Sequence, residues 1–196
     1  MRRIIFSISL LLFSLSSLPA RADSAVFAGG CFWCMESAYQ DVEGVSEVVS
    51  GFSGGSHENP TYNGAHTGHY EAVLVSYDAK VISYQDLLDL YWVNVDPFDG
   101  GGQFCDRGES YRPAIFVETS KERALAEVSS QRVAKQFPEQ VVVAPVLARS
   151  KFFPVVEGHQ DYYQKNPLRY KYYRYRCGRD QRLEEIWGDA AGGGKH

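Results

Sequence analysis

Strand-like and helix-like segments follow one another in an order that restricts the fold of this chain more than any other feature. Short apolar or alternating runs typical of strands occupy four segments: residues 24–28, 45–52, 69–78 and 111–118. Helix-forming segments lie between them at 31–42 and 84–95. This order, strand, helix, strand, strand, helix, strand, is the split β-α-β plan of ferredoxin-like folds. We therefore predict an α+β fold, a two-layer sandwich with a ferredoxin-like βαββαβ core.

Further segments extend this core. Ser83 and Asp86 have the spacing of a capping box at the start of the second helix. A third helix is predicted over 120–136 and another strand over 141–148. Residues 153–167 are assigned to a helix, and the aromatic and basic stretch after them to a C-terminal tail. At 196 residues the chain suits one domain.

The first 22 residues, MRRIIFSISLLLFSLSSLPARA, have the three parts of a secretory signal peptide. Arg2 and Arg3 precede an apolar run, and Ala20 and Ala22 flank the final arginine as in an A-x-A cleavage site. The apolar run falls short of the ~20 residues that a membrane span needs. We predict a signal peptide at 1–22, the domain at 23–188 and a mobile tail at 189–196. The mature chain is expected to cross the inner membrane, to act in the periplasm and to keep no membrane attachment.

The charge of the mature chain excludes one class of partner. Three of the 20 basic residues belong to the signal peptide, so 17 remain against 24 acidic residues, a formal charge of −7. An acidic chain is repelled by the phosphate backbone. We expect no nucleic-acid partner.

The four cysteines are Cys31, Cys34, Cys105 and Cys177. In an oxidising compartment an even number of cysteines is compatible with two structural disulfides. A zinc site is a weaker alternative, because the chain has a single C-x-x-C pair. His66, His69 and His159 are irregularly spaced and are interpreted as structural residues. Neither a metal nor another cofactor is predicted.

Cys31 follows two glycines and precedes a helical segment, so it is placed at a helix N-terminus. The partial positive charge of the unpaired N–H groups there favours a thiolate. Cys34 lies one turn later on the same helix face, which makes a disulfide between the two geometrically plausible. Phe32 and Trp33 are either core aromatics or the walls of an apolar pocket beside a reactive thiol.

Several motifs in order resemble those of the type A peptide methionine sulfoxide reductases. They are GCFWCMES at residues 30–37, NPTY at 59–62, GHYEAV at 68–73, CDRGESYR at 105–112 and GHQDYYQKNP at 158–167. The resemblance spans essentially the whole mature chain. It implies an α+β fold and the reduction of methionine S-sulfoxide, protein-bound or free, through a cysteine nucleophile, as a repair of oxidised proteins.

The resemblance also implies roles for individual residues. Cys31 matches the nucleophile, and Phe32 and Trp33 match the residues that hold the methyl group of the substrate. A thiolate displaces oxygen from the sulfoxide sulfur only when a proton reaches that oxygen. Glu71 is the expected acid. The positions that match the rest of the family's site are Tyr62, Glu71, Asp106 and Tyr111. Taken singly, each has an ordinary structural explanation, such as a solvent-facing strand residue for Glu71 or a turn residue for Asp106.

The second cysteine of the reaction has two candidates, because the chain departs from common family members. Position 34 is cysteine where glycine is frequent, and Cys177 stands ten residues after Pro167 instead of in an NPxGY pattern. We expect Cys34 to resolve the sulfenic acid on Cys31, with Cys177 as the alternative or as a second relay. Cys105 is interpreted as a buried bystander.

Two other classes of function remain open at this point. A thioredoxin-like disulfide oxidoreductase of the cell envelope also uses a strand, a C-x-x-C pair and a helix. A secreted binding or structural domain with two inert disulfides is the second alternative. For the reductase, the oxidising compartment requires a thioredoxin-like partner that supplies electrons to Cys34 or Cys177.

Overall fold

The computed structural model describes residues 23–192. The predicted signal peptide, 1–22, and the last part of the predicted tail, 193–196, lie outside the described residues. The N–H of Gly192 donates to the backbone oxygen of Val93 at 2.7 Å, which connects the preceding part of that tail to the domain. Within the described part of the chain, no helix combines the length and apolar character needed to span a membrane.

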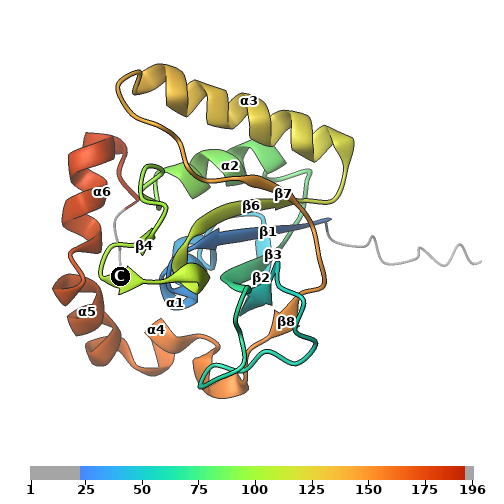
Figure 1. The fold of residues 1–196 in the computed structure, drawn as a ribbon, viewed down its shortest axis with the longest axis vertical. Helices are drawn as coiled ribbons and strands as arrows, with labels where there is room; N and C mark the ends of the chain where they lie inside the picture. Colours follow the sequence, from blue (N-terminus) through green and yellow to red (C-terminus); the bar gives the residue numbers. More distant parts are fainter. Residues whose placement is uncertain (1–22, 193–196) are drawn as a thin grey trace, which may run out of the picture.

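The fold is mixed α/β and is built on a central six-stranded sheet (Figure 1). In chain order the strands are β1 (Asp23–Gly29), β2 (Val45–Ser53), β3 (Tyr70–Tyr77), β6 (Pro113–Val117), β7 (Val146–Ala148) and β8 (Phe153–Pro154). Across the sheet they lie in the order β7-β6-β1-β3-β2-β8, and β6 and β7 are the one parallel pair of this sheet. Strands β4 (Gly102–Gln103) and β5 (Asp106–Arg107) form a separate hairpin.

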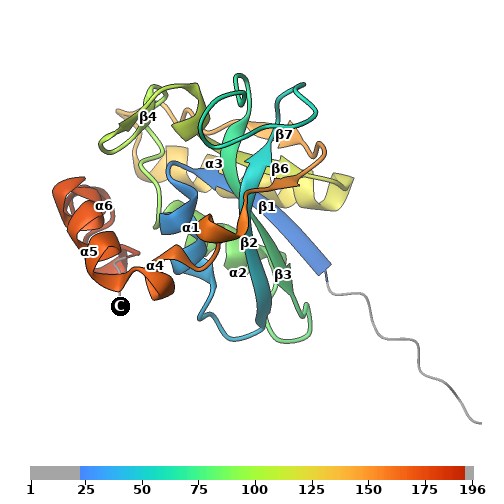
Figure 2. The same cartoon turned by 90° about the horizontal axis from the view of Figure 1, so that it is seen from below.

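Within residues 23–192, six helices accompany the sheet. Helices α1 (Phe32–Tyr39), α2 (Tyr84–Trp92) and α3 (Ser120–Gln136) contribute to the main core on one face of it. Helices α4 (Tyr162–Lys165), α5 (Pro167–Arg176) and α6 (Arg179–Trp187) form a column beside α1, as Figure 2 shows. Single 3₁₀ turns are η1 (Glu109–Tyr111), η2 (Glu157–His159) and η3 (Gly188–Ala190).

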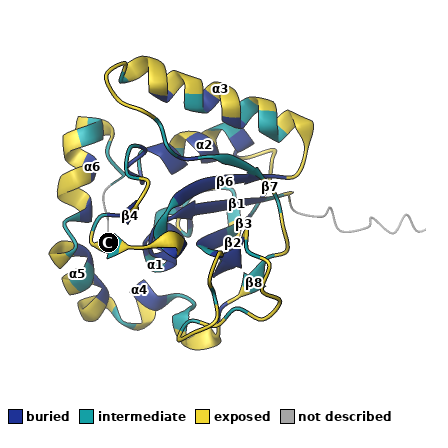
Figure 3. Cartoon of the chain, viewed as in Figure 1, coloured by how far each residue is buried: buried dark blue, intermediate teal, exposed yellow. Residues whose placement is uncertain are grey.

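Successive side chains of β1 point to opposite faces of the sheet, as they do in any strand. Phe27 stacks on Tyr39 of α1 and on Tyr91 of α2, with ring centroids 5.4 and 5.5 Å apart. Val26 belongs to a smaller cluster on the other face, with Phe116 of β6. The central strands are buried on both faces (Figure 3), so the sheet provides a rigid base for the segments that end at its edge.

The predicted capping box of α2 is confirmed. Asp86 N–H donates to Ser83 Oγ at 3.2 Å, and Ser83 N–H donates to Asp86 Oδ2 at 2.9 Å. The two side chains satisfy backbone donors that the first helical turn leaves unpaired.

Two predicted elements are wrong in extent. The strand expected over 141–148 is reduced to β7, because Pro145 has no N–H for a ladder and Val143 N–H donates to Pro97 O of a loop at 2.8 Å. The helix expected over 153–167 is replaced by an edge strand, a 3₁₀ turn and the single turn of α4. Asp161 has a φ of 52°, a left-handed conformation that a right-handed helix excludes.

Candidate active site

Cys31 is the N-cap residue of α1, as predicted, and stands where β1 ends against the helix. Gly30, at a φ of 84°, makes the turn between them, and a Cβ there would lie 2.6 Å from Gln103 Cβ. The Cys31 backbone oxygen accepts the N–H groups of Cys34 and Met35 and so begins the helix. Cys31 and Cys34 are both buried and both free thiols.

Glu71 is a buried residue of β3, only 2% exposed. Its Oε2 accepts the N–H of Phe32 at 3.1 Å, one of the donors that the first turn of α1 leaves unpaired. Burial raises the pKa of Glu71 to about 8, although the Phe32 N–H acts in the opposite direction. The solvent-facing interpretation of Glu71 is therefore wrong, and the structure holds a protonatable carboxyl group beside the nucleophile candidate.

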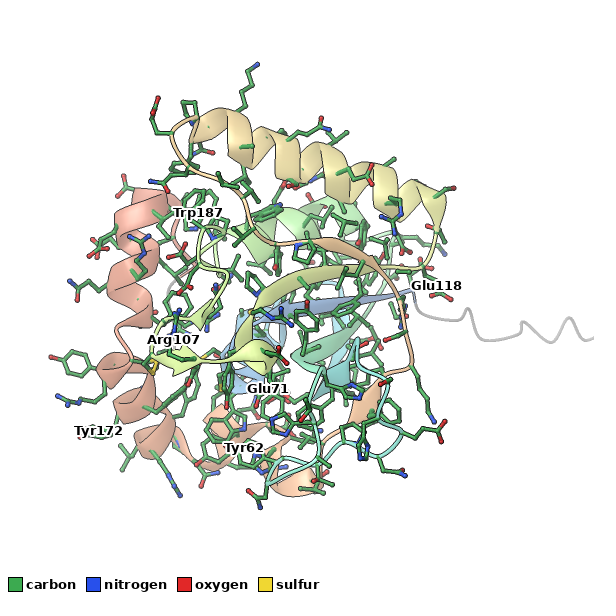
Figure 4. All side chains as sticks on the ribbon, in the orientation of Figure 1. Tyr62, Glu71, Arg107, Glu118, Tyr172 and Trp187 are labelled. Carbon is green, nitrogen blue, oxygen red and sulfur yellow. A yellow bond between two sulfur atoms is a disulfide. The ribbon has the colours of Figure 1, made fainter. Side chains whose placement is uncertain are left out.

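Tyr62 and Tyr111 reach the same region from two different loops. Burial raises the pKa of each hydroxyl, and the charges of Glu71 and Cys31 raise both further. Tyr62 also lies on the ring of Phe32, with centroids 6.1 Å apart (Figure 4 labels Tyr62 and Glu71). Both hydroxyls therefore stay protonated and remain hydrogen-bond donors at neutral pH.

Asp106 begins β5 and is more than a turn residue. The hydroxyl of Tyr173 on α5 donates to Asp106 Oδ2. Burial raises the pKa of Asp106, while this hydrogen bond and the charge of Arg179 lower it. Through Tyr173, which packs edge-on against Trp33 at 5.9 Å, Asp106 is connected to the aromatic part of the site.

Trp33 lies in a stack of aromatic rings that the sequence did not predict. Tyr162 of α4 stacks on it with centroids 3.7 Å apart and planes 6° apart. The ring of His159 lies 5.6 Å from Trp33 and 4.0 Å from Tyr62. Burial lowers the pKa of His159, which favours its neutral imidazole. In the sequence, His159 and Tyr162 belong to the motif at 158–167, which indicates the family but by itself marks neither residue as part of the site.

His66 and His69 support the loop between β2 and β3 rather than the site. His69 Nδ1 accepts the N–H of Gly55 at 3.2 Å, and its Nε2 lies 2.8 Å from the backbone oxygen of His57. His66 Nδ1 lies 2.8 Å from the backbone oxygen of Thr61. These bonds occupy both nitrogens of His69 with backbone groups.

Two arginines from the C-terminal column lie close enough to influence the thiol pair. Arg179 is fully buried and donates to the backbone oxygens of Gly29 at 3.0 Å and Asn94 at 2.7 Å. Arg174 is buried and pairs with Asp180. Neither arginine was predicted, because the sequence treated this region as a tail.

The two thiols differ in their ionisation. A hydrogen bond with Cys31 and the positive charges of Arg179 and Arg174 lower the pKa of Cys34 to about 6, against the effect of burial. Burial raises the pKa of Cys31, and the facing carboxyl groups of Glu71 and Asp106 add to the rise. Within this pair the surroundings favour a thiolate on Cys34 over one on Cys31, and the expected lowering of the Cys31 pKa at the helix start does not occur.

A disulfide joins Cys105 to Cys177, with Cα atoms 4.8 Å apart. Cys105 is exposed and Cys177 is partly buried at the end of α5, so the interpretation of Cys105 as a buried bystander is wrong. The Cys105 N–H donates to Cys177 Sγ at 3.1 Å. The pairing of one exposed disulfide with two free buried thiols also differs from the two inert disulfides of the structural alternative.

Comparisons with known proteins agree on one family. The family model for peptide methionine sulfoxide reductase matches residues 23–191. The chain is 49% identical to peptide methionine sulfoxide reductase MsrA 2 of Caulobacter vibrioides, over 86% of this chain and 87% of that protein. It is 44% identical to MsrA of Bacillus subtilis, over 87% of this chain and 99% of that protein.

A solved structure shows the same fold. The structure of methionine sulfoxide reductase A of Corynebacterium diphtheriae superposes with a TM-score of 0.67 at 26% identity and covers 79% of each chain. The reduced form of Mxr1 from Saccharomyces cerevisiae superposes with a TM-score of 0.69 at 24% identity, over 81% of this chain and 93% of that one. With the family model matched from the first described strand to η3, this chain belongs to the type A peptide methionine sulfoxide reductases.

Proposed function

We infer that this protein reduces methionine S-sulfoxide to methionine, with Cys31 as the nucleophile and Glu71 as the acid. The observation that carries the assignment is the buried Glu71 carboxyl group, which is hydrogen-bonded to the N–H of the residue after Cys31. The Cys31 sulfur attacks the sulfoxide sulfur while Glu71 protonates the oxygen. The S–O bond of the substrate then breaks as the hydroxyl group passes to the Cys31 sulfur, so that Cys31 becomes a sulfenic acid and methionine departs with its own sulfur.

The surrounding residues bind the substrate in this scheme. The hydroxyls of Tyr62 and Tyr111 donate to the sulfoxide oxygen, and Asp106 orients the Tyr173 hydroxyl at the edge of the aromatic stack. Phe32 and the Trp33 ring hold the methyl group, since an apolar alkyl group is stabilised by aromatic faces. The stacked rings of Trp33, Tyr162 and His159 are proposed to line this side of the substrate site.

We propose that Cys34 resolves the sulfenic acid. Its thiolate, hydrogen-bonded to Cys31, attacks the Cys31 sulfur, forms a Cys31–Cys34 disulfide and releases hydroxide, which is protonated to water. The Cys177 thiolate then attacks one sulfur of the Cys31–Cys34 disulfide, which breaks that bond and releases the other sulfur as a thiolate. The Cys105 thiolate next attacks Cys177, breaks the mixed disulfide and releases the second buried thiolate. The Cys105–Cys177 disulfide is the last state of this sequence and regenerates both buried thiols.

The compartment and the reductant complete the proposal. The signal-peptide pattern at 1–22 supports export to the periplasm, where disulfides are maintained. A thioredoxin-type protein is proposed to reopen the disulfide, and oxidised proteins are the proposed substrates. One structure of the same fold, yeast Mxr1, was solved in complex with Trx2. We also propose that β1, α1, β2, β3, α2 and β6 form a ferredoxin-like core, which the central strand order β6-β1-β3-β2 supports.

The test is a comparison of the two sulfoxide epimers. The purified mature chain with a small dithiol is expected to convert the S epimer completely and to leave the R epimer unchanged. Equal consumption of both epimers would contradict the assignment. A dithiol–disulfide oxidoreductase would instead reduce protein disulfides and leave both epimers, which separates the alternative from the proposal.

A further inference from the structure

Glu36 is a buried carboxylic acid of α1 that the proposed reaction does not use. Its side chain is 0% exposed, and it lies four residues before Gln40, on the same side of the helix. Glu36 Oε1 accepts the N–H of Asp161 at 3.1 Å. Gln40 Nε2 donates to Asp161 Oδ1 at 2.6 Å. Two residues of α1 therefore hold one residue of the loop before α4, by its backbone and by its side chain.

Asp161 needs such support because of its backbone conformation. Its φ of 52° lies in the left-handed region, which is unfavourable for a residue with a Cβ and persists only where the surrounding structure holds it. The Asp161 backbone oxygen accepts the N–H groups of Gln164 and Lys165 at 3.0 and 2.9 Å and so begins α4. The conformation of Asp161 therefore sets the position of α4, whose first residue is Tyr162.

The segment before Asp161 is fixed to the sheet and not to α1. Gln160 Oε1 accepts the N–H of Ser50 on β2 at 2.8 Å, and Gln160 Nε2 donates to the Ser50 backbone oxygen at 2.8 Å. Asp161 is thus the first residue after this connection to β2. The hydrogen bond between Glu36 and Asp161 joins α1 to the chain at the point where it turns into α4.

Tyr162 connects this hydrogen bond to the substrate site. It follows Asp161 directly, and its ring stacks on that of Trp33 with centroids 3.7 Å apart. Trp33 is itself a residue of α1, three positions before Glu36. Helix α1 therefore positions both rings of the stack: it carries Trp33, and it holds Tyr162 through the contact of Glu36 with Asp161.

The groups that face the Glu36 carboxyl group favour its neutral form. They are the Ser50 hydroxyl of β2, the Asp161 carboxylate, which pairs with Lys165 at 3.5 Å, and the Tyr163 phenol of α4. Within residues 23–192, no cationic side chain forms an ion pair with Glu36. Burial raises the pKa of Glu36 to about 7, although the Asp161 N–H acts in the opposite direction.

We propose that Glu36 is a positioning residue: through Asp161 it holds Tyr162 on Trp33 and so raises the affinity of the site for methionine sulfoxide. This inference rests on the proposed function, because the substrate is the one assigned there. The two rings line the site and exchange no proton or electron with the substrate. Loss of Glu36 is therefore expected to change KM and to leave kcat nearly constant.

Three variants of the mature chain separate this role from a general effect on stability. Glu36→Gln keeps an acceptor for the Asp161 N–H, whereas Glu36→Leu removes it and keeps a side chain of similar volume. Ser129→Ala is the matched control, since Ser129 is 1% exposed and its Oγ accepts Trp92 Nε1 at 2.7 Å, between α2 and α3. Each is assayed for reduction of methionine S-sulfoxide with dithiothreitol at pH 6, where most Glu36 is protonated.

Glu36→Leu is expected to raise KM about three- to tenfold, as expected for loss of one aromatic stack, with kcat within about twofold of the wild type. Glu36→Gln and Ser129→Ala are expected to stay within about twofold in both constants. In a Tyr162→Leu background, Glu36→Leu is expected to cause no further rise in KM, because no ring remains to be held. A fall in kcat alone, an equal effect of Glu36→Gln, or additive effects in the double variant would overturn the proposal.

Hydrogen exchange with mass spectrometry tests the contact without turnover. The amides of residues 157–165 are expected to exchange at least about threefold faster in Glu36→Leu than in the wild type, while those of α3 are unchanged. If this difference appeared in a protein that does not reduce sulfoxides, the proposed function would be wrong and the contact would stand. If it were absent in an active enzyme, the positioning role itself would be refuted.

The pH dependence gives a comparison that retains the side chain. The folded contact binds a proton that free Glu36 would release, so the contact is expected to weaken as pH rises towards about 7. The exchange rate of residues 157–165 in the wild type, divided by that in Glu36→Gln at the same pH, is expected to rise about tenfold between pH 5.5 and 7.5. A constant ratio would contradict the role of Glu36, even where Glu36→Leu fails to fold.

Discussion

The backbone N–H of Phe32 donates to Glu71 Oε2 at 3.1 Å, which ties the acid to the residue that follows Cys31. Because Phe32 directly follows Cys31, the hydrogen bond holds the proposed acid next to the backbone of the proposed nucleophile. Glu71→Gln keeps an acceptor for this N–H but removes the acidic proton. Sulfenic acid formation is expected to slow by roughly 10²–10⁴-fold, the range of general acid catalysis. Rapid single-turnover measurement checks this, and a loss below about tenfold would transfer the role to the tyrosines.

The raised pKa of Glu71 also makes stability depend on pH. Its carboxyl group titrates near 4.5 when unfolded and at about 8 when folded, so the folded state holds an extra proton between these values. The free energy of unfolding is therefore expected to fall as pH rises from about 4.5 to 8, by at most the order of 5 kcal/mol from this group.

Urea unfolding at several pH values checks this linkage. Glu71→Gln is expected to lose the fall in the free energy of unfolding with pH that Glu71 causes. The variant is therefore expected to be more stable than the wild type above pH 8. Burial also raises the pKa of Glu36, to about 7, so Glu36 lowers the free energy of unfolding as pH rises. This contribution is the same in both proteins and cancels in the comparison. Identical slopes for the two proteins would show that Glu71 is ionised in the folded state.

The stack of Tyr162 on Trp33 predicts a change in substrate binding. Tyr162→Leu removes an aromatic pair worth about 0.5–1.5 kcal/mol, so KM is expected to rise about three- to tenfold with little change in kcat. Tyr175→Leu, at an exposed site on α5, is the matched control and is expected to leave both constants unchanged with a small dithiol. An equal fall in kcat and no change in KM would place Tyr162 outside the binding pocket.

The assignment of the nucleophile predicts a sharp difference between neighbouring cysteines. Cys31→Ser is expected to abolish turnover while the circular dichroism spectrum and thermal transition stay near those of the wild type. Cys34→Ser is expected to form the sulfenic acid at a normal rate and to accumulate it, because the resolving thiolate is absent. A dimedone-type probe with mass spectrometry distinguishes the two variants. Turnover near wild type in Cys31→Ser would refute the scheme.

Because the Cys105–Cys177 disulfide is exposed, we expect Cys105 to be needed for reduction by a protein and not for the first turnover. Cys105→Ser is expected to reduce one sulfoxide at the wild-type rate, since the residue lies outside the buried thiol pair. Multiple turnovers with a thioredoxin are expected to slow by about tenfold or more, because a protein reductant reaches the exposed sulfur and a buried one poorly. Unchanged turnover with the thioredoxin would mean that electrons enter elsewhere.

Local patterns account for the parts of the molecule that the sequence predicted well. The place of Cys31 at a helix start follows from the strand, the two glycines and the helical segment around it. The Ser83–Asp86 capping box depends on residues three positions apart. Glu71 was identified only by its joint fit with other motifs, because a single strand glutamate has no local mark of burial.

The parts that were missed depend on contacts between distant segments. Cys105 and Cys177 are 72 residues apart, and no local pattern specifies which cysteine each would meet. Tyr162 stacks on Trp33 only because residues 153–167 bend at Asp161 instead of forming the expected helix. Arg179 enters the core because α6 turns back over the start of α1, which the assignment of this region to a tail could not anticipate.

The separation of the two cysteine pairs, one buried and one exposed, gives the enzyme a reservoir of reducing power. A chain with all four thiols reduced holds four electrons, and each sulfoxide consumes two. With the proposed relay it would repair two methionines after it has left its reductant, the first by drawing on the outer pair and the second on the inner pair. In a compartment without a soluble thiol pool, these stored reducing equivalents would let the enzyme repair a substrate in one place and be reduced again in another.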